Sequence, residues 1–287
     1  MLADGRLLRT TRARFSNGSL GIRGFYWYGV GNTLHDWNEV LYLRLLEQTR
    51  AWRQAHPASI TAPVAEAELL LGYAWLARGN GYANTVTDGG WSQFRERLHR
   101  AHEVLDQAAK RPRRCPGWYF AALNLAVGEE WPEAEGERLF REARATDPKC
   151  ETFYDLRSWA LTPNWQGSPG DWESFLETAV GDLDPPEARR IYAYVVYKRS
   201  RNYRNVFRET RADWGRTRLG YDEMLGLWPR SLEFRSQAAR LALDAGDLDY
   251  ARTMFEVIGL REDPHVWQDV QEFLAGRARA QAAARRR

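Results

Sequence analysis

The feature that most constrains the fold of this chain is a succession of helix-length apolar segments that starts at Leu34 and continues almost to the C-terminus. The segment from Trp91 to Ala109 shows the pattern most clearly, because its apolar residues recur three or four positions apart: Phe94, Leu98, Ala101, Leu105 and Ala108. Alternating, strand-like patterns are almost absent. The sequence therefore predicts an all-α fold.

Proline and glycine residues mark the expected starts and ends of these helices. Pro116 lies where a first helical residue belongs, and Gly79 lies where a helix C-terminus with positive φ belongs. Ser168 and Pro169 predict another start, with Ser168 as N-cap and Asp171 in the first turn. The expected helices are 34–53, 61–79, 91–109, 115–128, 132–145, 151–161, 169–180, from 184 through 196, 213–227, 231–245, 247–259 and a closing helix from 263.

The two ends differ from the rest of the chain. Residues 1–33 are rich in glycine and aromatic residues, which predicts an irregular segment. Residues 34–276 are expected to form a single helical-repeat domain. Residues 277–287 form a basic tail that is expected to fray.

Composition places the chain among folded proteins, since 44% of its 287 residues are hydrophobic and 28% are charged. No apolar run approaches the roughly 20 residues of a membrane span, so no membrane partner is expected. The first residues are Arg-rich without a secretory apolar core, which predicts a cytoplasmic protein. A net charge of +3 does not favour nucleic acid as a partner.

The two cysteines, Cys115 and Cys150, are 35 residues apart and each opens the first helix of an expected pair. They should therefore occupy corresponding places on neighbouring helices, with Cα atoms beyond the about 7 Å that a disulfide tolerates. Both thiols are expected to be reduced.

The helices come in pairs, and the pair over 231–259 resembles a tetratricopeptide repeat. Small and aromatic residues stand at the positions where two such helices approach and stack: Ala238, Ala242, Gly246, Ala251 and Phe255. An imperfect copy lies at 118–148. This resemblance implies an α-solenoid of stacked helical hairpins.

A second resemblance covers roughly residues 59–179. The stretches that carry it are Trp75–Val86, Gly90-Trp91, Cys115–Tyr119, Leu139-Phe140 and Trp165–Glu173. In their order and spacing they are similar to a bacterial family catalogued as domain of unknown function 4034. The resemblance implies a helical-repeat fold and supplies no activity, cofactor or catalytic residue.

No coherent catalytic set is visible in the sequence. Gly79-Asn80-Gly81 lacks the strand and the third glycine of a dinucleotide fingerprint. His99 and His102 share a helix but have no third metal ligand nearby in the sequence. No catalytic residue, metal or cofactor is therefore expected.

Loop composition gives the better functional clue. The connections 79–90 and 163–168 lie within helix pairs, and such loops emerge together on one edge of a solenoid. They are therefore expected to approach each other closely. The candidate binding residues are Arg78, Tyr82, Asn84, Thr85, Trp91, Trp165, Asp171 and Trp172. A helix cap at Ser168 backed by a core Trp172 is the structural alternative for the second loop.

Aromatic residues on the first helices of the pairs, among them Trp75 and Trp159, could line a concave binding face or fill the core. The preferred hypothesis is a non-catalytic repeat protein that binds a protein or peptide through its loop edge or concave face. The alternative is an enzyme or small-ligand protein with its site at Gly79–Gly90 and Trp165–Trp172.

Overall fold

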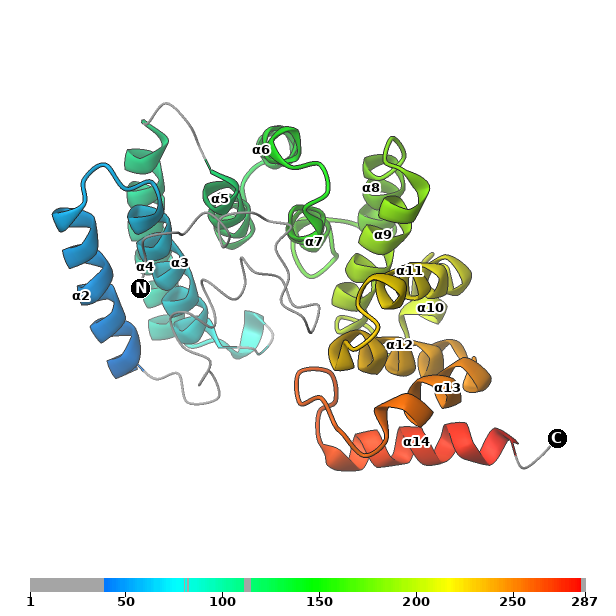
Figure 1. Cartoon of the computed structure of the whole chain (residues 1–287). Helices are drawn as coiled ribbons and strands as arrows, with labels where there is room; N and C mark the ends of the chain where they lie inside the picture. The colour runs from blue at the N-terminus through cyan, green and yellow to red at the C-terminus, as the bar shows by residue number, and fades with distance from the viewer. Residues whose placement is uncertain (1–38, 80, 82, 111–114, 285–287) are drawn as a thin grey trace. The chain divides into compact units, whose positions relative to one another are not determined.

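A computed structural model describes residues 39–79, 81, 83–110 and 115–284 of the chain (Figure 1). These residues form thirteen α-helices and one short 3-10 turn, and none of them lies in a strand. The prediction of an all-α fold is confirmed. The expected irregular segment 1–33 lies outside the described residues.

The described residues divide into two compact units, 39–160 and 161–284. The first unit contains α2 (Glu39–Ala55), α3 (Thr61–Arg78), the 3-10 turn Ala83–Thr85, α4 (Asp88–Ala109), α5 (Pro116–Gly128), α6 (Glu133–Thr146) and α7 (Glu151–Ala160).

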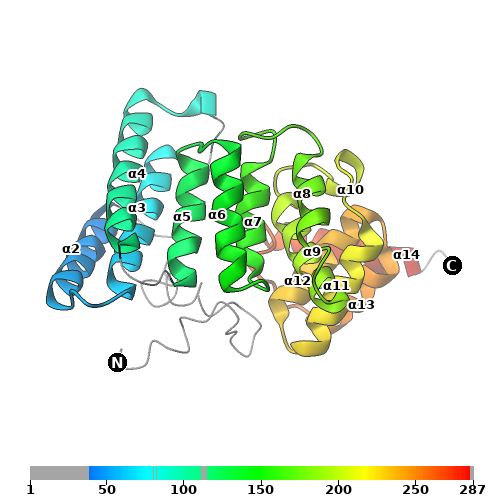
Figure 2. The ribbon, with the colours of Figure 1, turned by 90° about the horizontal axis from the view of Figure 1, so that it is seen from above.

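Within the first unit, α3 is the central helix of the N-terminal half. It packs against α2, α4 and α5, and α5 in turn packs against α6 and α7. Figure 2 shows α5, α6 and α7 side by side. Helix α5 therefore contacts both α3 and α7 directly. Helix α4 packs against α3 and α5, and α6 packs against α5 and α7.

The first unit follows its sequence pattern closely. All five residues of the predicted apolar stripe on α4 are buried. Cys115 precedes α5 as its N-cap and Pro116 is the first helical residue, as predicted. Gly79 ends α3 with a φ of +70°, a conformation that residues with a side chain rarely adopt.

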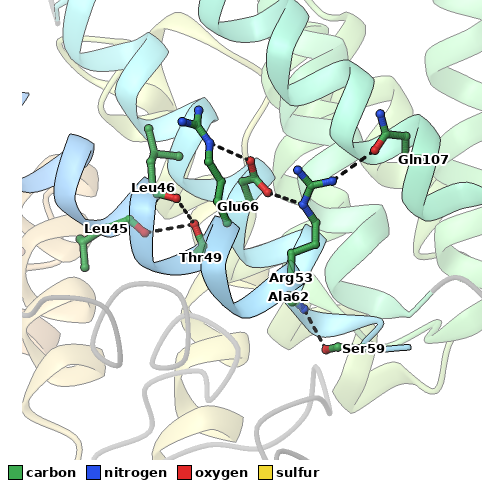
Figure 3. A network of polar contacts seen from close by, with 9 residues as sticks. Leu45, Leu46, Thr49, Arg53, Ser59, Ala62, Glu66 and Gln107 are labelled. Carbon is green, nitrogen blue, oxygen red and sulfur yellow. Dashed lines mark hydrogen bonds and ion pairs between the residues drawn. The ribbon is translucent and has the colours of Figure 1, made fainter. Parts of the chain in front are cut away.

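A buried carboxylate fixes α2 on this unit (Figure 3). Glu66 of α3 is 2% exposed and lies between two arginines of α2: Nε of Arg50 at 3.3 Å and Nε of Arg53 at 2.7 Å. The Arg53 guanidinium also donates a hydrogen bond to Gln107 of α4 at 3.2 Å. The Glu66 carboxylate thus ties α2 to α3, and its two arginine partners compensate the cost of removing it from water. The Arg53–Gln107 hydrogen bond ties α2 to α4.

The second unit contains α8 (Asp171–Ala179), α9 (Pro185–Ser200), α10 (Val206–Glu209), α11 (Trp214–Leu227), α12 (Leu232–Ala245), α13 (Leu248–Ile258) and α14 (Val270–Ala284). Here α9 packs against α11, α11 against α12, and α12 against α13, while α14 contacts both α12 and α13.

The helix pair α12–α13 has the core that its sequence predicts. Ala238, Ala242 and Ala251 are completely buried, and Phe255 is 1% exposed. Gly246 between the helices has a φ of +81°, in the left-handed region that favours glycine. Small residues therefore lie where the two helices approach each other.

The predicted start of α8 is wrong. The helix begins at Asp171, its N-cap is Gly170 with a φ of +97°, and Ser168 and Pro169 precede it in a turn. Ser168 acts through its backbone N–H, which donates to the Asp171 carboxylate at 2.7 Å. The Asp171 carboxylate in the first turn therefore accepts the backbone N–H of Ser168, and the Ser168 hydroxyl does not cap the helix.

The closing helix also begins later than predicted, at Val270. The backbone N–H groups of Val266 and Trp267 bond to the Asp263 carbonyl in an isolated turn, and both side chains are buried. The Arg240 guanidinium donates a hydrogen bond to the Val266 carbonyl at 2.6 Å. The helix then continues to Ala284, beyond the expected start of a frayed tail, and Arg277 donates to the Gly259 carbonyl at 2.9 Å.

Both cysteines are free thiols at the starts of α5 and α7, which pack against each other as predicted. Cys115 is half-buried, whereas Cys150 is completely buried and lies 3.0 Å from the Thr152 hydroxyl. Burial raises the pKa of the Cys150 thiol to about 11, so its reactive thiolate is scarce at neutral pH.

We expect a thiol reagent to modify Cys115 of the native protein at least about tenfold faster than Cys150, because only thiolate reacts. After unfolding without a reductant, both should be modified. Mass spectrometry of the labelled chain checks both statements. Fewer than two labels on the unfolded chain would contradict the assignment of two free thiols.

Candidate functional site

An aromatic cluster surrounds Trp75 near the C-terminal end of α3. Its ring centroid lies 4.9 Å from that of Phe94 on α4 and 5.3 Å from that of Trp159 on α7. Trp91, in the first turns of α4, contacts Phe94 edge-on at 5.8 Å. Phe94 is buried, whereas the three tryptophans are only half-buried. The cluster therefore has a buried base and a partly exposed surface.

The contact between Trp75 and Trp159 reaches across α5. Helices α3 and α7 both pack against α5, and each contributes one ring of this pair. The half-exposed residues Phe120 and Asn124 lie one helical turn apart on α5. We refer to six partly exposed residues of these three helices, Glu68, Trp75, Phe120, Asn124, Asp155 and Trp159, as the α3–α5–α7 face.

Arg78 lies between two aromatic rings at the edge of this cluster. The centre of its guanidinium is 5.6 Å from the Trp75 ring and 5.5 Å from the Trp91 ring, within the range of a cation–π interaction. The same guanidinium donates hydrogen bonds to the carbonyls of Gly79 and Gly81, at 3.2 and 3.1 Å. Arg78 thus joins the first residues of the loop to the cluster, and the structure brings together two predicted site residues, Arg78 and Trp91.

Most of the described residues in the rest of that loop are exposed. Asn84 and Thr85 lie in the 3-10 turn with solvent-exposed side chains, and Thr87 caps α4 by accepting from the Gly90 N–H at 3.1 Å. Tyr82 lies outside the described residues. The loop therefore presents polar groups beside the cluster without adding a buried polar side chain to it.

The second group of predicted site residues belongs to the other compact unit. Trp172 is 1% exposed, and its indole N–H donates to the Tyr203 hydroxyl at 3.1 Å, so it lies in the core of that unit. Asp171 is exposed and accepts the Ser168 N–H, and Trp165 is half-buried. The eight predicted site residues are thus divided between two units.

Two acceptors on the α3–α5–α7 face, one on α3 and one on α5, are buried without a hydrogen bond from the described residues. One carboxylate oxygen of Glu68, Oε1, is buried and accepts no hydrogen bond from any described residue. Burial raises the pKa of this carboxyl group to about 8. The amide oxygen of Asn124 is likewise buried and accepts no hydrogen bond within the described part of the chain.

The eight predicted site residues did not include Glu68, Asn124, Trp75 or Trp159, although the sequence offered Trp75 and Trp159 as residues of a concave binding face or of the core. For Glu68 one signal was present, because Glu68 and Trp75 are seven residues apart on a largely apolar helix and so share a face. Glu66 stands in the same helix, however, and only the fold shows that Glu66 has two arginine partners while Glu68 Oε1 accepts no hydrogen bond from the described residues.

Among the residues that the structure describes, no group of three or more His, Cys, Asp and Glu side chains could hold a metal ion. No helix in the described ranges is long and apolar enough to cross a membrane. No family model, curated protein or solved structure matches this chain.

Proposed function

We propose that this chain is a non-catalytic helical-repeat protein and that it binds a peptide segment of a partner protein on the α3–α5–α7 face. The observation that carries the proposal is the contact of Trp75 with Trp159 across α5, at 5.3 Å, with both rings half-exposed. Aromatic side chains that remain partly exposed give large contact area at low conformational cost, which is typical of protein-binding surfaces.

The order of helix contacts supports a repeat architecture. In tetratricopeptide-like solenoids, the first helices of successive pairs contact each other and together line one face. The helices α3, α5 and α7 contact each other in this order, while α4 and α6 take the place of second helices. The proposed surface is therefore the face that the first helices share, and the loop 79–90 forms its neighbouring edge.

A selection from a phage library of random dodecapeptides on the immobilised full chain tests this function. We expect enriched peptides whose affinity falls at least tenfold for Trp159→Ala, because the ring supplies contact area, and changes less than twofold for Trp165→Ala. Circular dichroism and thermal melting establish that both variants are folded. If Trp165→Ala abolishes binding and Trp159→Ala does not, the site lies at the other loop and the proposal is wrong.

A further inference from the structure

We propose that the α3–α5–α7 face receives a basic side chain, lysine or arginine, of the bound peptide, with Glu68 and Asn124 as its hydrogen-bond acceptors. This inference rests on the proposed function and names the chemistry of the partner.

The two carboxylates of α3 are in opposite situations. Glu66 has two arginines, Arg50 and Arg53, within 3.3 Å. Glu68, two residues later, has a buried oxygen that accepts no hydrogen bond from the described residues, and desolvation raises the pKa of its carboxyl group. A buried acceptor without a donor costs free energy, which a cationic ligand would recover by pairing with it.

Asn124 adds a second buried acceptor that needs a hydrogen-bond donor. It lies on α5, which packs directly against α3, and its buried Oδ1 accepts no hydrogen bond in the described structure. Asp155, one turn from Trp159 on α7, adds a further carboxylate to the face. The two buried acceptors on the adjacent helices α3 and α5 call for a ligand with several donors, and lysine and arginine carry donors only.

The aromatic pair lies at a defined distance from this acceptor. Seven residues of α-helix separate Glu68 from Trp75, which is about 10 Å along the axis of α3. An extended peptide advances about 3.3 Å per residue, so about three residues span the two positions. The bound segment should therefore carry a basic residue and a large apolar residue two to four positions apart, the second against Trp75 and Trp159.

The dodecapeptide selection on the full chain also tests this inference, through the sequences that it enriches. We expect enriched peptides to share a lysine or arginine at that spacing from an apolar residue. Replacing the basic residue of a synthetic copy by norleucine should weaken binding at least tenfold, measured by isothermal titration calorimetry. Glu68→Gln should weaken binding of the basic peptide at least tenfold and leave the norleucine peptide unaffected.

Glu96→Gln is the matched control, because it makes the same substitution at an exposed carboxylate of α4. It should change affinity less than twofold. Enriched peptides without a common basic residue, or equal binding by the wild type and Glu68→Gln, would overturn the inference while leaving peptide binding intact. Absence of any enriched peptide would overturn the proposed function as well. Enriched peptides that match a segment of residues 1–38 would overturn the assignment to a partner protein, because this chain would then supply the bound segment itself.

Discussion

Replacing Gly220 by alanine is expected to destabilise the second unit by about 3 kcal/mol, the upper range for overpacking a close contact. Gly220 of α11 is buried against α9, and an added Cβ would lie 2.2 Å from the Arg189 carbonyl oxygen and 2.6 Å from the Ala193 Cβ. Both neighbours resist displacement, since one is backbone and the other is attached to it directly. The two helices would have to separate, which loses contact along their whole interface.

Urea unfolding, followed by circular dichroism, measures this loss. Gly226→Ala is the matched control on the same helix, because its Cβ would meet nothing within 4 Å. That variant should gain up to about 1 kcal/mol from the better helix propensity of alanine. The account of the α9–α11 contact fails if Gly220→Ala loses less than about 1 kcal/mol.

Truncation of Trp172 is expected to have the other large effect. Trp172 is 1% exposed in the second unit, so Trp172→Ala removes a large ring from the core and should cost about 3–5 kcal/mol of unfolding free energy. Trp172→Phe keeps most of the apolar volume and loses the hydrogen bond to the Tyr203 hydroxyl, so its cost should be nearer 1–2 kcal/mol by the usual worth of such a bond, about 1 kcal/mol.

The same urea unfolding experiment ranks the two Trp172 variants. If Trp172→Ala were as stable as the wild type, Trp172 would be a surface recognition residue, as the sequence suggested, and its position in the core would be wrong.

Helix periodicity proved sufficient for most of the fold. The stripe from Phe94 to Ala108 and the small residues Ala238 and Ala242 could be assigned to the core because apolar spacing depends only on local helix geometry. The start of α8 could not, because the Asp171 carboxylate accepts the Ser168 N–H and Gly170 takes the N-cap position. Arg211, which is distant in the sequence, bonds to both the Gly170 carbonyl and the Glu173 carboxylate, and no local pattern indicates those contacts.

The candidate site was less predictable than the fold. Arg78 and Trp91 were recognised because they flank an unusual loop, and the structure confirms that they lie together. The spacing of Glu68 from Trp75 was only a weak signal and Asn124 carries none, since a buried polar residue becomes a candidate site only when its partners are known. Trp172 was given two interpretations, a binding residue and a core residue, because a tryptophan near a loop has the same sequence signature in a core and at a surface. Its burial agrees with the core alternative.

The central claim, that a peptide binds across α3, α5 and α7, is tested most directly by the indole N–H signals of the 13 tryptophans in nuclear magnetic resonance spectra of the full chain. The variants Trp75→Phe and Trp159→Phe assign the two signals concerned. Titration with a peptide enriched on the full chain should shift both signals, saturating at one peptide per chain, and leave the Trp165 and Trp172 signals in place. Shifts confined to Trp165 or to other tryptophans, with Trp75 and Trp159 unchanged, would contradict the claim.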